Sequence, residues 1–84
     1  MVHIGTVISL SVNSDESEAF VVAERIDDIG HGEGGWKCIE VDALLQKGAN
    51  NISPFDCWRI TDKYLDAQMK RGVIQIVDDI KCEN

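Results

Sequence analysis

The sequence predicts a single α+β domain over residues 1–84, with an antiparallel sheet of about four strands under one long amphipathic helix. Three observations support this two-layer prediction. Ile and Val supply 18 of the 37 apolar residues, and β-branched side chains favour strands. Several short stretches alternate polar and apolar residues, whereas one longer stretch repeats its apolar residues at helical spacing. The expected element order is therefore β-β-β-short α-α-β.

Four stretches have the composition of strands. Residues 2–12 alternate, with one side formed by Val2, Ile4, Thr6, Ile8, Leu10 and Val12. Residues 18–26 and 36–41 alternate in the same way, and short connections predict that the first three strands form an antiparallel meander. Residues 73–77 are apolar on both faces, which favours a strand that is central or covered by the helix.

Two helices are expected between the third and the fourth strand. Asp42 precedes a short helical stretch that Gly48 ends. Ser53 followed by proline is typical of a helix start, so we expect the long helix over residues 54–71, ended by Gly72. At helical spacing its buried side contains Trp58, Ile60, Thr61, Tyr64 and Leu65.

The glycine-rich stretch IGHGEGGWKC, residues 29–38, resembles a phosphate-binding loop in its spacing alone. Gly30, Gly32 and Gly35 fit G-x-G-x-x-G, but a strand follows them instead of the helix that would hold a pyrophosphate. A G-K-[ST] sequence is absent, and neighbouring carboxylates would repel phosphate. We expect a mobile hairpin connection here.

The net charge of −7 is unevenly distributed along the chain. Residues 1–35 carry −6 and residues 36–84 carry −1. An acidic protein repels phosphate groups, because binding them requires Lys and Arg. The charge therefore argues against direct binding to nucleic acid and against a membrane surface.

Cysteine usage and the first residues indicate a cytoplasmic protein. Cys38, Cys57 and Cys82 are odd in number and lack C-x-x-C spacing, which suits a reducing compartment. The N-terminus has no basic segment or cleavage motif of a secretory signal, and no apolar run is long enough to span a bilayer. His3 and His31 do not share a short chelating spacing with these cysteines, so no metal site and no cofactor are expected.

Catalysis is not expected either. His31 as a base with Cys38 or Cys82 as a nucleophile would need a spatial adjacency that the sequence does not indicate. The chain contains no G-x-S-x-G or H-E-x-x-H motif, and its paired acids lie beside strand ends, where solvated carboxylates are common.

The acidic N-terminal region favours an interaction protein that binds a basic partner. The candidate partner-binding residues are Asp15, Glu16, Glu18, Asp27, Asp28, Glu33 and Trp36. Dispersed carboxylates can imitate a phosphate array, so an inhibitor of a nucleic-acid-binding protein fits, as phage-borne and toxin-neutralising inhibitors do. That comparison rests on size and charge, and no motif assigns a family.

Two further expectations stay open. The alternative function is a small structural subunit or a small-ligand-binding domain without catalysis, which gains weight if the acids are scattered among Arg25, Lys37 and Lys47. A homodimer is the other expectation, through an edge-to-edge or a face-to-face contact of the first strand, because residues 4–12 carry no charge that would discourage pairing.

Overall fold

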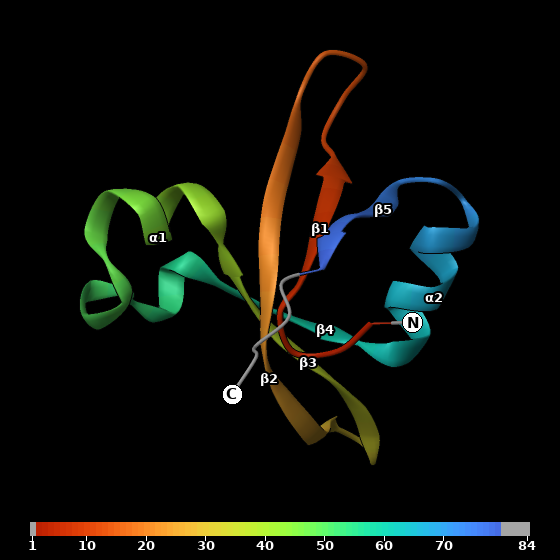
Figure 1. Ribbon diagram of the computed structural model, residues 1–84. Coiled ribbons are helices and arrows are strands. Elements are labelled where there is room, and N and C mark those ends of the chain that lie inside the picture. Colours follow the sequence, from red (N-terminus) through yellow and green to blue (C-terminus); the bar gives the residue numbers. More distant parts are fainter. Residues whose placement is uncertain (1, 80–84) are drawn as a thin grey trace.

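The computed structural model describes residues 2–79 and forms an α+β domain with a five-stranded antiparallel sheet in the order β4-β3-β2-β1-β5 (Figure 1). The elements are β1 (Thr6–Ser11), β2 (Ser17–Gly30), β3 (Glu33–Glu40), α1 (Val41–Lys47), η1 (Ala49–Asn51), η2 (Pro54–Asp56), β4 (Cys57–Thr61), α2 (Asp62–Lys70) and β5 (Ile74–Asp79), where η marks a 3-10 helix. The predicted α+β class and the antiparallel meander of the first three strands are confirmed, whereas the number of strands and the long helix differ.

The long strand β2 organises the sheet. Residues 17–21 pair with β1, and pairing with β3 begins at Phe20 and reaches Gly30, so the two hairpins extend toward opposite ends of the molecule (Figure 1). The β2–β3 register shifts between Val22 and Glu24 and again between Ile26 and Gly30. Such bulges bend a strand and increase its twist, which lets one strand serve both hairpins.

The core lies between α2 and one face of the sheet. Its buried members are Ile8, Phe20, Val22, Cys38, Ile60, Leu65 and Ile74. These residues come from all five strands and from α2, and Trp36, Trp58 and Met69 pack against them. The alternation predicted for the first strands is confirmed at Ile8, Phe20 and Val22.

The long helix predicted over residues 54–71 is wrong. The structure divides this segment into η2, the strand β4 and the nine-residue helix α2. Ser53 and Asp56 do form the expected capping box, but they cap a single 3-10 turn. The helix starts at Thr61, whose hydroxyl accepts the Tyr64 backbone N–H at 3.1 Å.

A physical reason accounts for this error. The sequence of β4, CWRIT, fits both the helical period and the two-residue period of a strand, because Ile60 falls on the apolar side in either case. β-branched and aromatic residues favour the strand, and pairing with β3 supplies backbone hydrogen bonds that decide the outcome. The sheet therefore has five strands, and both α-helices are short.

The positions of two strands in the sheet also differ from expectation. Residues 73–77 were expected in a strand that is central or covered by the helix. Within residues 2–79, β5 pairs with β1 alone and forms an edge; Ile74 is buried in the core with Leu65 of α2, whereas Ile76 is 39% and Val77 57% exposed. β1 has partners on both sides, so it offers no free edge for the expected homodimer. The homodimer stays a prediction, but the edges available to it are β4 and β5.

The glycine-rich stretch is a turn, as predicted, but a short one. Gly30 pairs with Glu33, leaving His31 and Gly32 as the two loop residues with φ of 56° and 77°. Positive φ at both central residues matches the type I′ turns that suit hairpins. Gly35 is needed for another reason, since a Cβ there would lie 2.1 Å from the carbonyl oxygen of Ile60.

The short helix α1 is confirmed, and Gly48 ends it with φ 80°. Its N-cap is Glu40 instead of Asp42, which lies in the first turn. With η1 and η2, α1 forms a lobe beside the sheet, on the side away from α2 (Figure 1). This lobe shapes both of the hollows described below.

Candidate functional site

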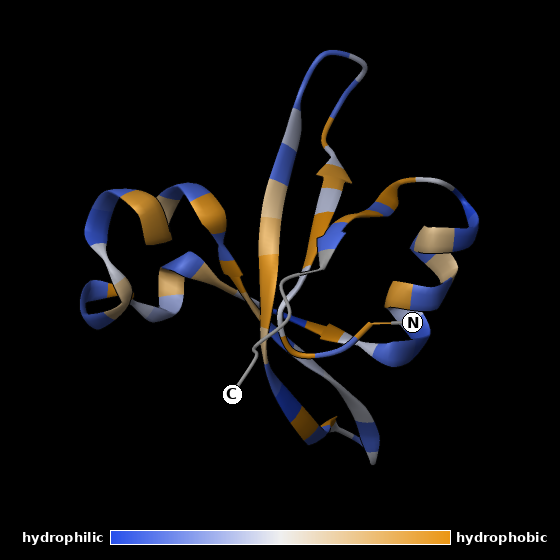
Figure 2. Ribbon diagram, in the orientation of Figure 1, coloured by the Kyte–Doolittle hydropathy of each residue, from blue (hydrophilic) through white to orange (hydrophobic). Residues whose placement is uncertain are grey.

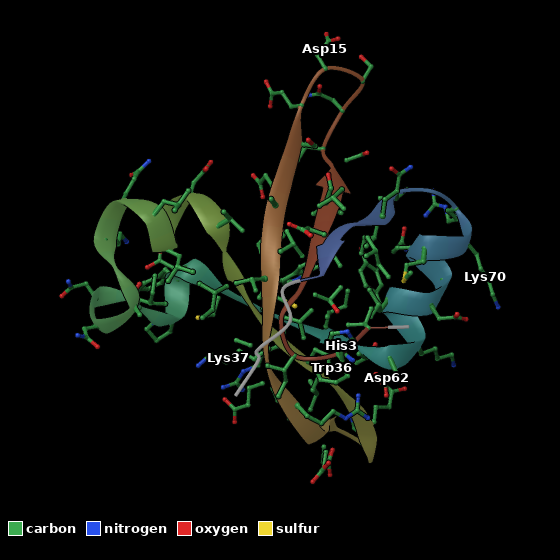
Figure 3. The ribbon with its side chains drawn as sticks, viewed as in Figure 1. His3, Asp15, Trp36, Lys37, Asp62 and Lys70 are labelled. Atoms are coloured by element: carbon green, nitrogen blue, oxygen red, sulfur yellow. The ribbon has the colours of Figure 1, made fainter. Side chains whose placement is uncertain are left out.

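The acidic residues predicted to bind a partner form two groups at opposite ends of β2. Asp15, Glu16 and Glu18 belong to the β1–β2 hairpin, whose tip carries Asp15 in Figure 3. Asp27, Asp28 and Glu33 belong to the β2–β3 hairpin. Glu18 and Asp27 are nine residues apart along the strand, which corresponds to a separation of about 25–30 Å. The structure therefore does not bring the six carboxylates onto one face.

The β2–β3 group is tied to local structure. The Asp28 carboxylate accepts the backbone N–H of Gly32 at 3.1 Å, which supports the two-residue turn. A cation, Arg25, lies on the same strand and forms a salt bridge with Asp62 of α2 at 2.7 Å. Asp62 therefore already compensates Arg25, and Asp27, Asp28 and Glu33 form no ion pair within the described residues.

The β1–β2 group is free of such ties. The Asn13 side chain accepts hydrogen bonds from the backbone N–H groups of Asp15 and Glu16, at 2.9 and 3.0 Å. These bonds hold the turn without using either carboxylate. Within residues 2–79, the carboxylates of Asp15, Glu16 and Glu18 form no ion pair. Figure 2 shows this hairpin tip as hydrophilic. Its negative charge is uncompensated.

A hollow of about 340 Å³ lies next to this hairpin, where the core face of the sheet extends beyond α2. We call it the acidic hollow, and it is lined by Leu10, Glu18, Phe20, Glu40, Phe55, Asp56, Cys57 and Trp58. The rings of Phe20 and Trp58 are 5.1 Å apart. Phe55 of η2 is 97% exposed, a large apolar surface left in water. Aromatic surface and carboxylates therefore meet in one place.

The three carboxylates at the acidic hollow differ in role. Asp56 accepts the Ser53 backbone N–H at 3.0 Å and pairs with Lys47 at 2.9 Å. The Ser53 N–H first, and then the Lys47 ammonium, hold the pKa of Asp56 below its ordinary value. Asp56 is thus part of the scaffold, whereas Glu18 and Glu40 have no ion-pair partner in the described chain.

Trp36 lies elsewhere, as a cover for the core. It is half-buried, and the Arg25 guanidinium lies 4.9 Å from its ring centroid. Arg25 donates two hydrogen bonds to the Asp62 carboxylate, at 2.7 and 2.8 Å. Trp36 and Asp62 lie close together in Figure 3, far from Asp15. Trp36 therefore does not belong to the acidic hollow.

Three residues of the acidic hollow were missed by sequence reasoning: Glu40, Phe55 and Trp58. Glu40 and Trp58 lie on the same sheet face as Phe20, since Phe20 pairs with Glu40 and Cys38 pairs with Trp58. If CWRIT is taken as a strand that pairs with β3, Trp58 falls on the same face of the sheet as Phe20. The sequence does not predict that Phe55 is exposed, because an apolar residue directly after Ser53 and Pro54 is expected in the first turn of a helix.

The catalytic and metal candidates are not brought together. Cys38 is fully buried, and burial raises the pKa of its thiol to about 11. His31 occupies the exposed β2–β3 turn, and the Cys57 Sγ donates to the Ser53 carbonyl at 3.5 Å. Cys82 lies outside the described residues. Among residues 2–79 no three His, Cys, Asp or Glu side chains are placed to hold a metal ion.

Comparisons with known proteins leave the site to be interpreted from its own chemistry. No family model matches the chain, and no curated protein or solved structure matches it significantly. Within the described residues, no helix is both long and apolar enough to cross a membrane.

Proposed function

We propose that this chain is a small interaction protein without catalytic activity that binds a basic protein through the β1–β2 hairpin and the acidic hollow. One observation carries the proposal. The almost fully exposed ring of Phe55 lies at a hollow that also contains Trp58 and the unpaired carboxylates Glu18 and Glu40. Nothing in the described chain covers this surface.

The chemistry of the hollow suits an Arg or Lys side chain. Carboxylates attract the charged head, and aromatic faces bind cations and the methylene stem. Aromatic residues also carry much of the binding energy at protein interfaces. An exposed Phe beside two carboxylates thus offers both an apolar contact and charge complementarity.

The hairpin adds long-range attraction to this contact. Asp15 and Glu16 project beyond the sheet without compensating cations, so they would raise the association rate with a basic surface. A nucleic-acid-binding protein offers such a surface. In that case the chain would act as an inhibitor, and nucleic acid would compete with it for the partner.

A direct test uses a labelled peptide of alternating arginine and serine, with citrulline replacing arginine in the neutral control. We expect binding that weakens as salt rises, because salt screens these charges over about 8 Å at physiological ionic strength. The double variant Glu16→Lys/Glu18→Lys should weaken binding at least about tenfold, and Phe55→Ala should weaken it without any change of charge.

The matched control is Asp27→Lys/Glu33→Lys, which changes the net charge equally at the other end of β2 and leaves the contact between Asp28 and Gly32 in place. It should affect affinity much less. Equal losses in the two double variants would show that net charge alone attracts the peptide. Equal affinity for the citrulline peptide, or full affinity of Phe55→Ala, would also contradict the proposal.

A further inference from the structure

A second hollow lies on the opposite face of β3 and β4, and it has the opposite charge. It measures about 630 Å³ and is bounded by the sheet and by the segment of residues 49–54. We call it the basic groove. Lys37 and Arg59 contribute its charges, and Ile39, Ile52 and Pro54 are among its apolar lining residues.

The two cations of the basic groove are direct neighbours. Lys37 pairs with Arg59 in the β3–β4 register, so both side chains lie on the same face. Cβ atoms of such pairs are about 5 Å apart, and like charges directly opposite each other destabilise a sheet. Figure 3 shows Lys37 on the other side of the sheet from Trp36 and Asp62. Two positive charges therefore lie directly opposite each other on neighbouring strands, an arrangement that is unfavourable unless an anion lies close by.

Within residues 2–79, no carboxylate forms a salt bridge with either cation of the basic groove. Arg25, Lys47 and Lys70 each form a salt bridge with an aspartate. Lys37 and Arg59 form none within residues 2–79, although the protein carries a net charge of −7. Glu24 is the cross-strand neighbour of Lys37 on its other side, yet no ion pair joins them. Lys37 and Arg59 are thus adjacent cations that form no salt bridge in the described chain, with Glu24 opposite Lys37, and an external anion bound between them would relieve their mutual repulsion.

We infer that the basic groove binds a small organic anion that has an apolar body. The head would be a carboxylate or a phosphate, which the planar Arg59 guanidinium can hold with two hydrogen bonds and Lys37 with a point charge. The body would lie against Ile39, Ile52 and Pro54. Apolar walls with a few charged groups at one end are typical of small-molecule sites. This inference does not depend on the proposed function, because the two hollows lie on different faces of the sheet.

Amide NMR titrations with octanoate, octyl phosphate, octanol and inorganic phosphate test the inference. We expect octanoate or octyl phosphate to shift the amides of Lys37, Ile39, Cys57 and Arg59, and to bind at least about tenfold more tightly than octanol or inorganic phosphate. Preference between the two anions identifies the head group. Binding by octanol as tight as by the anions, or no shift with any of them at millimolar concentration, would overturn the inference.

Charge-neutralising variants locate the site. Arg59→Gln and Lys37→Gln should each weaken octanoate or octyl phosphate binding about tenfold, whereas Lys63→Gln, which removes the same charge from exposed α2, should not. Equal losses in all three variants would show that general charge attracts the anion. Unchanged thermal midpoints would show that each variant keeps its fold.

Discussion

At the scale of single residues, Asp62 links α2 to the sheet. Its carboxylate accepts two hydrogen bonds from Arg25, and hydrogen bonding to Arg25 is the main cause of its lowered pKa. Arg25 in turn stacks on the Trp36 ring. One exposed carboxylate thus orients the cation that covers the end of the core.

Acid should weaken this link. Because the folded-state pKa of Asp62 lies below the ordinary value near 4, its contribution to stability is present above that value and is lost as pH falls through the folded pKa. Asp62→Asn should therefore lower the urea midpoint at pH 7, with a much smaller difference from the parent chain at pH 3. Urea unfolding followed by tryptophan fluorescence measures this. A difference that is the same at both pH values would contradict the role given to the Asp62 charge.

The two described cysteines should react at very different rates. Cys38 is fully buried, with a thiol pKa of about 11, whereas Cys57 is partly accessible. Peptide mapping after brief iodoacetamide treatment at pH 8 should find Cys57 modified and Cys38 protected until urea unfolds the chain. Equal labelling of both in the folded protein would mean that Cys38 is not in the core.

At the scale of elements, the difference between sequence and structure lies in residues 54–71. The sequence predicted the turn and cap residues of this region correctly. They are Gly48, Ser53, Asp56 and Gly72. Local pattern could not decide between strand and helix for residues 57–61, since that choice depends on pairing with a strand twenty residues away. For the same reason the sequence did not reveal that Glu40 and Trp58 share a hollow.

α2 should still be sensitive at the position that faces the core. Leu65 is 5% exposed, so Leu65→Ala should cost about 2–5 kcal/mol of unfolding free energy. The thermal midpoint would then fall by about 4–8 °C for each kcal/mol. Lys63→Ala, on the exposed side of the same helix, should change it little. Similar effects at the two positions would contradict the packing of α2.

The β2–β3 hairpin offers a matched pair of glycine substitutions. A Cβ on Gly35 would meet the Ile60 backbone at 2.1 Å and the Ile29 side chain at 2.3 Å, so Gly35→Ala must push β4 away from β3. We expect a loss of about 1–3 kcal/mol or more. Gly30→Ala has open space around it and should stay within about 0.5 kcal/mol. Differential scanning calorimetry compares them, and equal stability of the two variants would contradict the close approach of β4.

At the scale of the whole molecule, charge is distributed by topology more than by sequence position. The acidic first 35 residues suggested one negative face, but β2 carries its two acidic groups to opposite ends. Among the described residues, the group at the β1–β2 end adjoins the exposed ring of Phe55, and Lys37 and Arg59, which form no salt bridge there, lie on the other face of β3 and β4. The molecule therefore presents two oppositely charged sites, which net charge could not reveal.

Amide NMR mapping with the arginine–serine peptide tests the central claim most directly. Binding at the acidic hollow should shift the amides of Glu18, Phe20, Glu40, Phe55 and Trp58, and leave those of Asp27, Asp28 and Glu33 nearly unchanged. Shifts that centre on the β2–β3 hairpin, or that spread evenly over every exposed acid, would contradict binding of a basic partner at the acidic hollow.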